Sequence, residues 1–259
     1  SLKKDWGSCA LLCNQASLAT EFKSSVDIVK ASIGDNLKAL WGPQHGYWST
    51  LQDNMIETSD EPASEHDLPI HSLYSHTREP TSVMLDGVDT ILVDIQIVGC
   101  RVYTFKYTLS ACLRAAKKHG KKVVVFDRPN PLGGVTLEGR CLNLAAKSFV
   151  GEFEIPMRHG LTPGEVAKLF NKKIGADLEV IAMKHWQPDL MWKDQRLPWV
   201  MTSPNLPSCD SLYLYPGMVI FEGTNLSEGR GTTHPFQFVG APYIHSSRDF
   251  VREVESRIG

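Results

Sequence analysis

The sequence predicts an α/β fold in which a mostly parallel sheet is flanked by helices. Short runs of apolar and β-branched residues alternate with segments of helical periodicity, and these runs lack the polar alternation of a half-exposed strand. Alternating strands and helices indicate βαβ units with right-handed crossovers. With 259 residues, 42% hydrophobic and 22% charged, the chain can bury one large or two smaller cores.

The N-terminal elements are predicted to be a strand, a helix and a second strand. Residues 10–15 are an apolar run that ends in polar amides, and residues 37–41 are another. Helical spacing between them is shown by Phe22, Val26, Val29 and Ile33. Residues 44–68 are polar and have no sustained period, so we expect a long loop, which in a compact domain is usually functional or disordered.

The next elements are predicted to be strand, helix and strand. Residues 90–95 and 121–127 are continuous apolar runs, as expected for parallel strands covered on both faces. Residues 105–119 between them are amphipathic, with one apolar face formed by Leu109, Cys112, Leu113 and Ala116.

The pattern changes after Gly133 and Gly134, where long loops separate fewer periodic segments. Thr162 as N-cap, Pro163 at the first helical position and Glu165 three residues after the cap predict the start of a helix. Residues 178–183 resemble a strand and residues 248–258 a helix. We therefore expect an α/β domain at 1–147 and a smaller α+β domain at 148–259.

Composition excludes several classes of function. The 27 basic and 29 acidic side chains are scattered, so we expect no nucleic-acid partner. The six cysteines form no CxxC pair or zinc-like cluster, so we expect no metal, no disulfide framework, and buried thiols at Cys9 and Cys13. No apolar run approaches the roughly 20 residues of a membrane span. The polar start at residues 1–6 and the stop at Gly259 suggest a piece of a longer protein.

Polar residues follow three of the predicted strands, at residues 42–46, 94–96 and 127–131. In a parallel sheet these segments would converge on one crevice at the carboxyl ends of the strands. Asp127 and Arg128 could instead form a salt-bridged turn stiffened by prolines, although rigid prolines around Asn130 also suit a binding site.

Two histidines and one glycine-rich segment are further candidates. His45 could be a hydrogen-bonded loop histidine, but glycines on both sides would let a ligand approach closely, and His159 before Gly160 has a similar setting. Residues 221–233 are dense in glycine and polar side chains, either as a solvated loop or as a ligand cradle containing Glu222, Glu228 and Arg230. No Walker, GxGxxG or GxSxG motif is present, which disfavours a nucleotide-dependent enzyme and a serine hydrolase.

Five blocks in chain order carry a resemblance to a known family. They are GPQHG at 42–46, DRPNPLGG at 127–134, IPMRHGLT at 155–162 with Gly164 and Glu165, SPNLP at 203–207, and FEGTNLSEGRGTT at 221–233. Together they span nearly the whole chain, and the last block is long and idiosyncratic. The chain resembles the exo-β-N-acetylmuramidase (NamZ-like) family.

The resemblance implies a glycoside hydrolase that releases N-acetylmuramic acid (MurNAc) from the non-reducing end of peptidoglycan fragments. It implies a Rossmann-like N-terminal domain, a smaller C-terminal domain that is incomplete in this chain, and a cleft for a terminal MurNAc. The implied partner is a peptidoglycan-derived sugar, either MurNAc-GlcNAc or a muropeptide, and no cofactor is implied. The resemblance also favours a bacterial protein that acts outside the cytoplasm.

The resemblance assigns catalytic candidates with one departure. The family commonly has a glutamate, its proposed catalytic acid, where this chain has Gln44, and an amide cannot donate and recover a proton as a carboxylic acid does. Glu222 or Glu228 could supply the proton instead, the chain could be inactive, or the role assigned to the family glutamate could be incomplete. The catalytic candidates are thus Gln44, His45, Glu222 and Glu228.

The remaining candidates would bind the sugar. Arg128, Arg230 and Asn225 would hold the lactyl carboxylate and hydroxyls, because guanidinium binds carboxylate through two parallel hydrogen bonds. Asp127 and His45 would orient these groups, and Asn130 and His159 complete the set of substrate-binding candidates. The alternative function is an amino-sugar-binding protein of the same fold that has lost catalysis.

Overall fold

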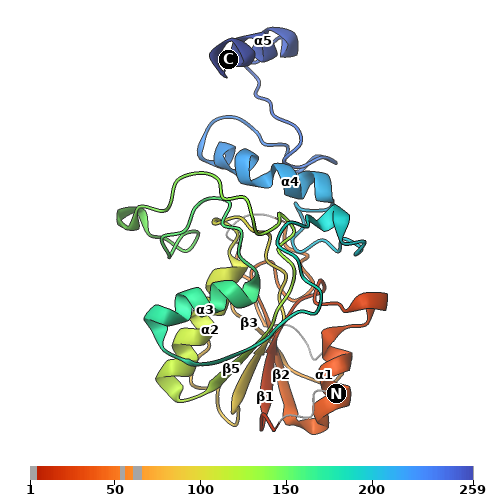
Figure 1. Cartoon of the computed structure of the whole chain (residues 1–259), viewed down its shortest axis with the longest axis vertical. Helices are drawn as coiled ribbons and strands as arrows, with labels where there is room; N and C mark the ends of the chain where they lie inside the picture. Colours follow the sequence, from red (N-terminus) through yellow and green to blue (C-terminus); the bar gives the residue numbers. More distant parts are fainter. Residues whose placement is uncertain (1–4, 53–55, 61–65, 259) are drawn as a thin grey trace. The chain divides into compact units, whose positions relative to one another are not determined.

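A parallel sheet lies at the centre of the first part of the chain (Figure 1). The computed structural model describes residues 5–52, 56–60 and 66–258. In these residues the sheet has six strands in the order β3-β2-β1-β4-β5-β6, and each neighbouring pair is parallel. The strands are β1 Cys9–Leu12, β2 Leu37–Gly42, β3 Ile70–Ser72, β4 Thr90–Val93, β5 Lys122–Phe126 and β6 Asp177–Ile181. The strand order reverses between β1 and β4, which is where ligands bind in many open α/β sheets.

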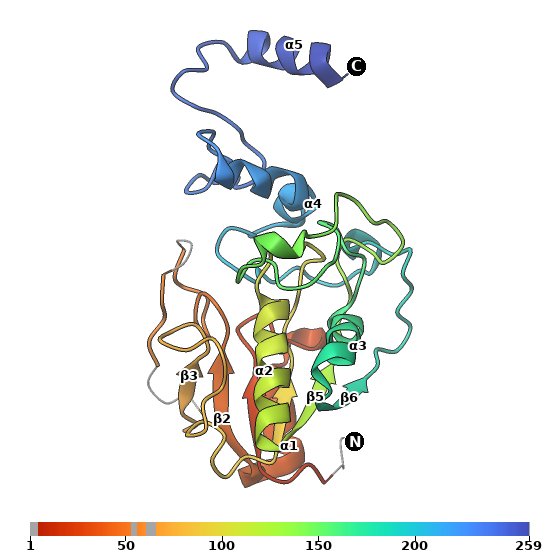
Figure 2. The same ribbon diagram turned by 90° about the vertical axis from the view of Figure 1, so that its left-hand side faces the viewer.

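Helices cover both faces of this sheet. α2 and α3 pack against each other on one face, and α1 lies on the other (Figures 1 and 2). The helices are α1 Ser25–Ile33, α2 Phe105–His119, α3 Pro163–Ile174, α4 Cys209–Met218 and α5 Ser247–Ile258. Short 3₁₀ turns are found at Thr20–Phe22, Gly34–Asn36, Leu144–Ala146, Trp192–Asp194 and Val219–Gly223.

The chain divides into two compact units, Ser1–Cys209 and Asp210–Gly259. The boundary predicted after residue 147 falls inside the first unit. Residues beyond that point complete the sheet, because β6 pairs with β5 along its whole length and α3 packs on α2. The first unit thus contains the entire α/β layer structure, and the second contains α5 and most of α4.

The predicted α/β class and most predicted elements are confirmed. β1 and β4 are buried along their whole length, and Cys9 and Cys13 are buried as expected. Phe22 was wrongly placed in the first helix: Ser24 caps that helix by accepting a hydrogen bond from the Asp27 amide, and Phe22 lies outside it with 62% exposure. Residues 1–4, 53–55, 61–65 and 259, which include parts of the predicted loop and termini, lie outside the described residues.

One buried lysine organises the loop between β4 and α2. Lys106 is fully buried in the first turn of α2, and its ammonium donates hydrogen bonds to the carbonyl oxygens of Cys100, Arg101 and Tyr103. Burial lowers the pKa of Lys106 to about 7. These three hydrogen bonds therefore fix the loop at the carboxyl end of β4.

Two further features are absent from the described residues. No helix there combines the length and the apolar character that a membrane span requires. Nor does any cluster of three or more histidine, cysteine or acidic side chains in those residues have an arrangement able to hold a metal ion.

Candidate functional site

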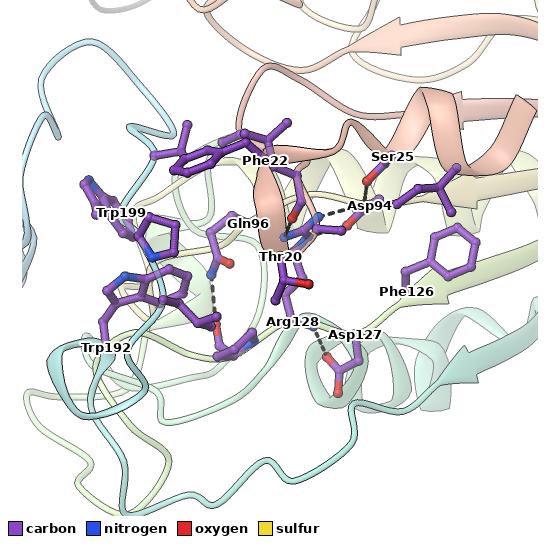
Figure 3. Close-up of a pocket in the computed structure, with 18 of the residues that line it drawn as sticks. Thr20, Phe22, Ser25, Asp94, Gln96, Phe126, Asp127, Arg128, Trp192 and Trp199 are labelled. Atoms are coloured by element: carbon purple, nitrogen blue, oxygen red, sulfur yellow. Dashed lines mark hydrogen bonds and ion pairs between the residues drawn. The ribbon is translucent and has the colours of Figure 1, made fainter. Parts of the chain in front are cut away.

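A cavity of about 340 Å³ opens at the carboxyl ends of β1, β4 and β5 (Figure 3). Three loops that follow these strands line it, together with one side of α1 and the segment at residues 192–200. Its aromatic walls are Phe22, Phe126, Trp192 and Trp199. The cavity lies within the first unit, at the reversal of strand order between β1 and β4.

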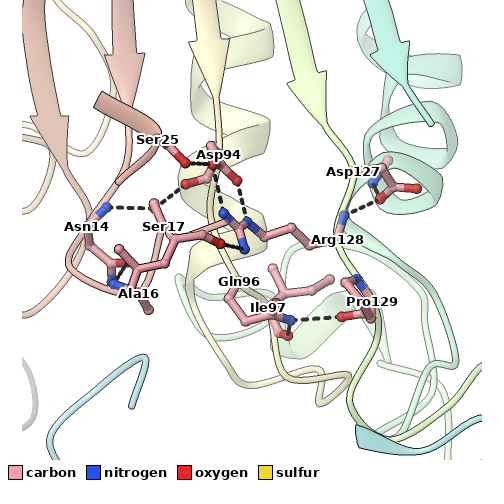
Figure 4. A network of polar contacts seen from close by, with 12 residues as sticks. Asn14, Ala16, Ser17, Ser25, Asp94, Gln96, Ile97, Asp127, Arg128 and Pro129 are labelled. Carbon is pink, nitrogen blue, oxygen red and sulfur yellow. Dashed lines mark hydrogen bonds and ion pairs between the residues drawn. The ribbon is translucent and has the colours of Figure 1, made fainter. Parts of the chain in front are cut away.

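A buried ion pair forms the polar floor of this cavity (Figure 4). Asp94 follows β4 directly, and its carboxylate accepts hydrogen bonds from Nε and Nη2 of Arg128 and from the Ser25 hydroxyl. Arg128 also donates from Nη1 to the Leu18 carbonyl oxygen at 2.9 Å. Although burial alone would lower it, the pKa of Arg128 is raised because the Asp94 carboxylate stabilises the charge. The guanidinium is thus already paired within the protein.

Asp127 connects the same edge of the sheet to α3. Its carboxylate accepts hydrogen bonds from the Gly164 amide at 2.7 Å, the Thr162 hydroxyl at 3.0 Å and the Arg128 amide at 3.0 Å. Burial raises its pKa, and these hydrogen bonds oppose the shift only in part. Asp127 therefore serves as an additional acceptor at the N-terminus of α3, where negative charge is stabilised.

Asn130 and Gln96 tie the loops after β4 and β5 together. Asn130 is fully buried and donates to the Leu161 carbonyl oxygen. Gly99 approaches it so closely that a Cβ there would lie 2.4 Å from the Asn130 Oδ1. Gln96 donates from Nε2 to the carbonyl oxygens of Ile97 and Pro129, at 2.7 and 2.8 Å. The predicted role of Asn130 in sugar binding remains a prediction, since both ends of its amide contact backbone.

His159 is buried and does not line the cavity. Its Nδ1 accepts a hydrogen bond from the Leu161 amide at 3.1 Å, so the proton of the neutral ring is on Nε2. Burial and the nearby charge of Lys106 lower the pKa of His159 well below its usual value. Among the described residues the buried Nε2 has no hydrogen-bond partner.

Gln44 and His45 follow β2 and do not line the cavity. Gln44 is buried, and its Oε1 accepts a hydrogen bond from the Thr104 hydroxyl at 2.5 Å. His45 has a positive φ of 73°, and its Nδ1 lies 2.7 Å from the Leu51 carbonyl oxygen. A carbonyl can only accept, so Nδ1 carries the proton, and Nε2 is the basic nitrogen of the neutral ring.

The second unit brings together the charged residues of the glycine-rich block. Arg230 forms ion pairs with both Glu222 and Glu228. Glu228 is buried at 6% exposure, whereas Glu222 is more exposed. Asn225 lies in the same unit, where its Oδ1 accepts a hydrogen bond from the Tyr243 hydroxyl at 2.8 Å.

The sequence predicted that three segments, at residues 42–46, 94–96 and 127–131, would meet at one crevice, and two of them meet at this cavity. Residues of the 94–96 and 127–131 segments line it, whereas those of 42–46 do not. Of the polar and aromatic lining residues, Asp94 and Gln96 were predicted only as part of the 94–96 segment and not as site residues, and Trp192 and Trp199 were not predicted at all. For the first two, the position directly after a buried strand was an available signal; no periodicity marked the two tryptophans.

Comparison with known proteins identifies the family. A family model described as the N-terminal part of exo-beta-N-acetylmuramidase NamZ matches residues 9–210, and one described as its C-terminal part matches residues 213–258. The chain belongs to the NamZ family. It is 46% identical over 241 residues to the peptidoglycan beta-N-acetylmuramidase NamZ of Bacillus subtilis.

Solved structures agree with this membership of the NamZ family. Two crystal structures of DUF1343 family proteins from Bacteroides fragilis match with TM-scores of 0.83 and 0.77, at 33% and 34% identity. They cover 96% and 92% of this chain. The chain in turn spans 58% of the Bacillus subtilis NamZ and 64% and 63% of the two Bacteroides fragilis chains.

Proposed function

We propose that this chain is the larger part of an exo-β-N-acetylmuramidase that removes MurNAc from the non-reducing end of peptidoglycan fragments. One observation carries the proposal: the NamZ family models match both parts of the chain in order, and a relative at 46% identity is a peptidoglycan beta-N-acetylmuramidase. A cavity at the reversal of strand order in the sheet supports it, because ligands bind there in open α/β folds.

The proposed reaction is hydrolysis of a β-glycosidic bond. A carboxylic acid protonates the leaving oxygen, while a base that activates water, or the acetamido oxygen of the substrate, stabilises the oxocarbenium-like transition state. Gln44 cannot be this acid, so Glu222 and Glu228 are our candidates for it. Gln44 would instead orient the substrate through its amide, since Thr104 fixes the amide by donating to Oε1.

The other candidate residues would position the substrate or the loops around it. Nδ1 of His45 donates to the Leu51 carbonyl oxygen, which fixes the orientation of the imidazole ring. Asp127, Asn130 and His159 would act by holding the loops around the sugar. Arg230 and Asn225 are the proposed contacts to carboxylate and hydroxyl groups of the substrate, whereas Arg128, which is paired with Asp94, would hold the floor of the cavity.

The test is release of free MurNAc from MurNAc-GlcNAc or from a chromogenic MurNAc glycoside by the full-length protein. We expect turnover, and we expect Glu228→Gln or Glu222→Gln, whichever removes the acid, to lower kcat roughly 10²-fold to 10⁴-fold. Arg252→Gln is the matched control, because Arg252 is an exposed charge in α5. Absence of turnover at high enzyme concentration would remove the enzymatic proposal.

The second candidate function is amino-sugar binding without catalysis, and Gln44 is the observation that favours it. Binding of MurNAc with no turnover in the same assay would support it. In that case Gln44→Glu, which restores the family carboxyl, is the variant in which activity would be sought.

A further inference from the structure

The lysine at the start of α2 occupies a place that is unfavourable for a positive charge. Lys106 has no exposed surface, and in the described part of the chain no carboxylate acts on its ammonium. It also lies in the first turn of a helix, where the helix dipole disfavours a cation. An apolar side chain would be less costly there, so the three hydrogen bonds of the ammonium to the loop before α2 must serve another purpose.

The end of that loop holds the side chain of Gln44. Thr104 is the N-cap residue of α2, yet its hydroxyl makes no capping hydrogen bond and donates instead to Oε1 of Gln44 at 2.5 Å. A threonine at this position normally stabilises its helix by accepting a hydrogen bond from an amide of the first turn. Thr104 forgoes that contribution, and its hydroxyl fixes the amide of Gln44.

Tyr103, directly before Thr104, holds a second segment. Its hydroxyl donates to Oγ1 of Thr202 at 2.8 Å, and both residues are buried. Thr202 precedes the SPNLP block at 203–207, to which the proposed function gives no role. Because Lys106 donates to the Tyr103 carbonyl oxygen, it fixes the peptide that joins Tyr103 to Thr104. One ammonium group thus holds the backbone from which both contacts are made.

We propose that Lys106 is a positioning residue for the candidate site: through the peptide between Tyr103 and Thr104, it sets the orientation of the Gln44 amide. The inference rests on the proposed function, in which that amide orients the substrate. An ammonium has three hydrogens, and all three are used here, so loss of one proton leaves one of the three carbonyl oxygens without a donor. The orientation of Gln44 therefore depends on the charge of Lys106.

The charge of Lys106 changes near neutral pH, because burial lowers its pKa to about 7. Four groups lie beside the ammonium or interact with its charge: Cys100, Arg101, Tyr107 and His159. Burial raises the pKa of Cys100 and of Tyr107 and lowers that of His159 well below its usual value. These three groups stay uncharged near pH 7, so Lys106 is the member of this cluster that titrates there.

The first test needs no ligand and follows the side-chain amide of Gln44 by NMR between pH 6 and 8. The signal is assigned by its loss in Gln44→Glu. We expect it to shift in the unmodified protein with a midpoint at about pH 7, and to lose this response in Lys106→Met, which has a similar length but no donor. Absence of a shift in the unmodified protein, or the same midpoint in Lys106→Met, would overturn the proposal, since the neighbouring His45 could then account for the response.

The second test uses variants at the other end of the connection. Thr104→Val removes the hydroxyl and keeps the shape, whereas Thr104→Ser keeps the hydroxyl. We expect the pH response of Gln44 to vanish in Thr104→Val and to return in Thr104→Ser, because the response passes through this hydroxyl. Should Lys106→Met fail to fold, this pair decides alone: an unchanged response in Thr104→Val contradicts the proposal.

Leu113→Ala is the matched control for loss of stability. Leu113 is fully buried in α2, about two turns beyond Lys106, so its truncation destabilises the helix packing without touching the loop. We expect this variant to melt at a lower temperature and to keep the pH response of Gln44. Loss of the response in Leu113→Ala as well would mean that Lys106 has only a structural role.

MurNAc release from MurNAc-GlcNAc is measured in parallel on the same proteins. We expect Thr104→Val to lower kcat about tenfold or more with little change in KM, and Thr104→Ser to restore it, because a misplaced positioning group slows the chemical step. Turnover without a response of Gln44 to the charge of Lys106 contradicts the positioning role alone. A response of Gln44 in a protein without turnover contradicts the hydrolase alone.

Discussion

The pairing of Asp94 with Arg128 determines how the floor of the cavity is held. Two guanidinium nitrogens meet the carboxylate, both side chains are largely buried, and Ser25 donates to the same carboxylate. Removal of one partner leaves an uncompensated charge in a poorly solvated place, which is far more costly than loss of an exposed ion pair. The costs of losing a buried and an exposed ion pair can both be measured in this chain.

We expect Arg128→Met to lower the free energy of unfolding by about 3–5 kcal/mol, since it leaves Asp94 without its counter-charge. Urea denaturation followed by circular dichroism measures the loss. Arg252→Met is the control: Arg252 and Asp249 form an exposed pair at 3.6 Å, so its loss should cost less than about 1 kcal/mol. Similar losses in the two variants would contradict the role assigned to the buried pair.

A second prediction at the residue scale concerns His159 and pH. Its pKa is lowered in the folded protein, so below about pH 6.5 the unfolded chain takes up a proton that the folded chain does not. Stability contributed by neutral His159 is therefore present above pH 6.5 and decreases as the pH falls below it. His159→Asn keeps an acceptor for the Leu161 amide but cannot titrate.

The measurement is the free energy of unfolding of both proteins between pH 7.5 and 5. The difference between wild type and His159→Asn should shrink as the pH falls, because only the wild type loses this contribution. A difference that stays constant over the range would show that His159 does not titrate between the two states.

At the scale of elements, the start of α3 is fixed by two acceptors, Thr162 and Asp127, which are linked by a hydrogen bond from the Thr162 hydroxyl to the Asp127 carboxylate. Thr162 and Glu165 form a reciprocal capping box, and Asp127 adds a carboxylate from the end of β5. Thr162→Val keeps the shape but removes the hydroxyl, so we expect a loss of about 1–2 kcal/mol of unfolding free energy. Ser24→Ala at α1 loses only one capping hydrogen bond and should cost less. A larger loss in Ser24→Ala than in Thr162→Val would contradict this account.

The same elements show what could be predicted from the sequence. The capping box at Thr162 and the apolar runs of β1, β4 and β5 are local signals, and the structure confirms them. β3 was not predicted because it has only three residues, and α4 was not predicted because Pro216 and Gly217 interrupt its pattern. Helix and strand formation at these two segments depends on tertiary contacts rather than on local propensity.

The site was less predictable than the fold for the same reason. Arg128 was a candidate for a substrate carboxylate, yet its carboxylate partner is Asp94, which lies beside it because β4 and β5 are neighbours in the sheet. Trp192 and Trp199 reach the cavity from a segment without periodicity. Adjacency of strands and the course of long loops are properties of the whole chain, and no local motif records them.

At the scale of the whole molecule, the cavity depends on the first unit alone. All the segments that line it lie between residues 16 and 200, and the sheet that supports them is complete before residue 209. A compact unit with its own core can fold independently. The fragment 5–209 should therefore retain the fold of the first unit and the cavity within it.

We expect this fragment to unfold in one cooperative thermal transition, because the whole sheet and the helices α1, α2 and α3 lie within it. Circular dichroism at increasing temperature measures the transition. A shorter fragment that ends at residue 176 lacks β6, which pairs with β5 along its whole length, so this fragment should unfold at a lower temperature. Equal midpoints for the two fragments would contradict the role assigned to β6, and absence of a cooperative transition in fragment 5–209 would show that the first unit does not fold alone.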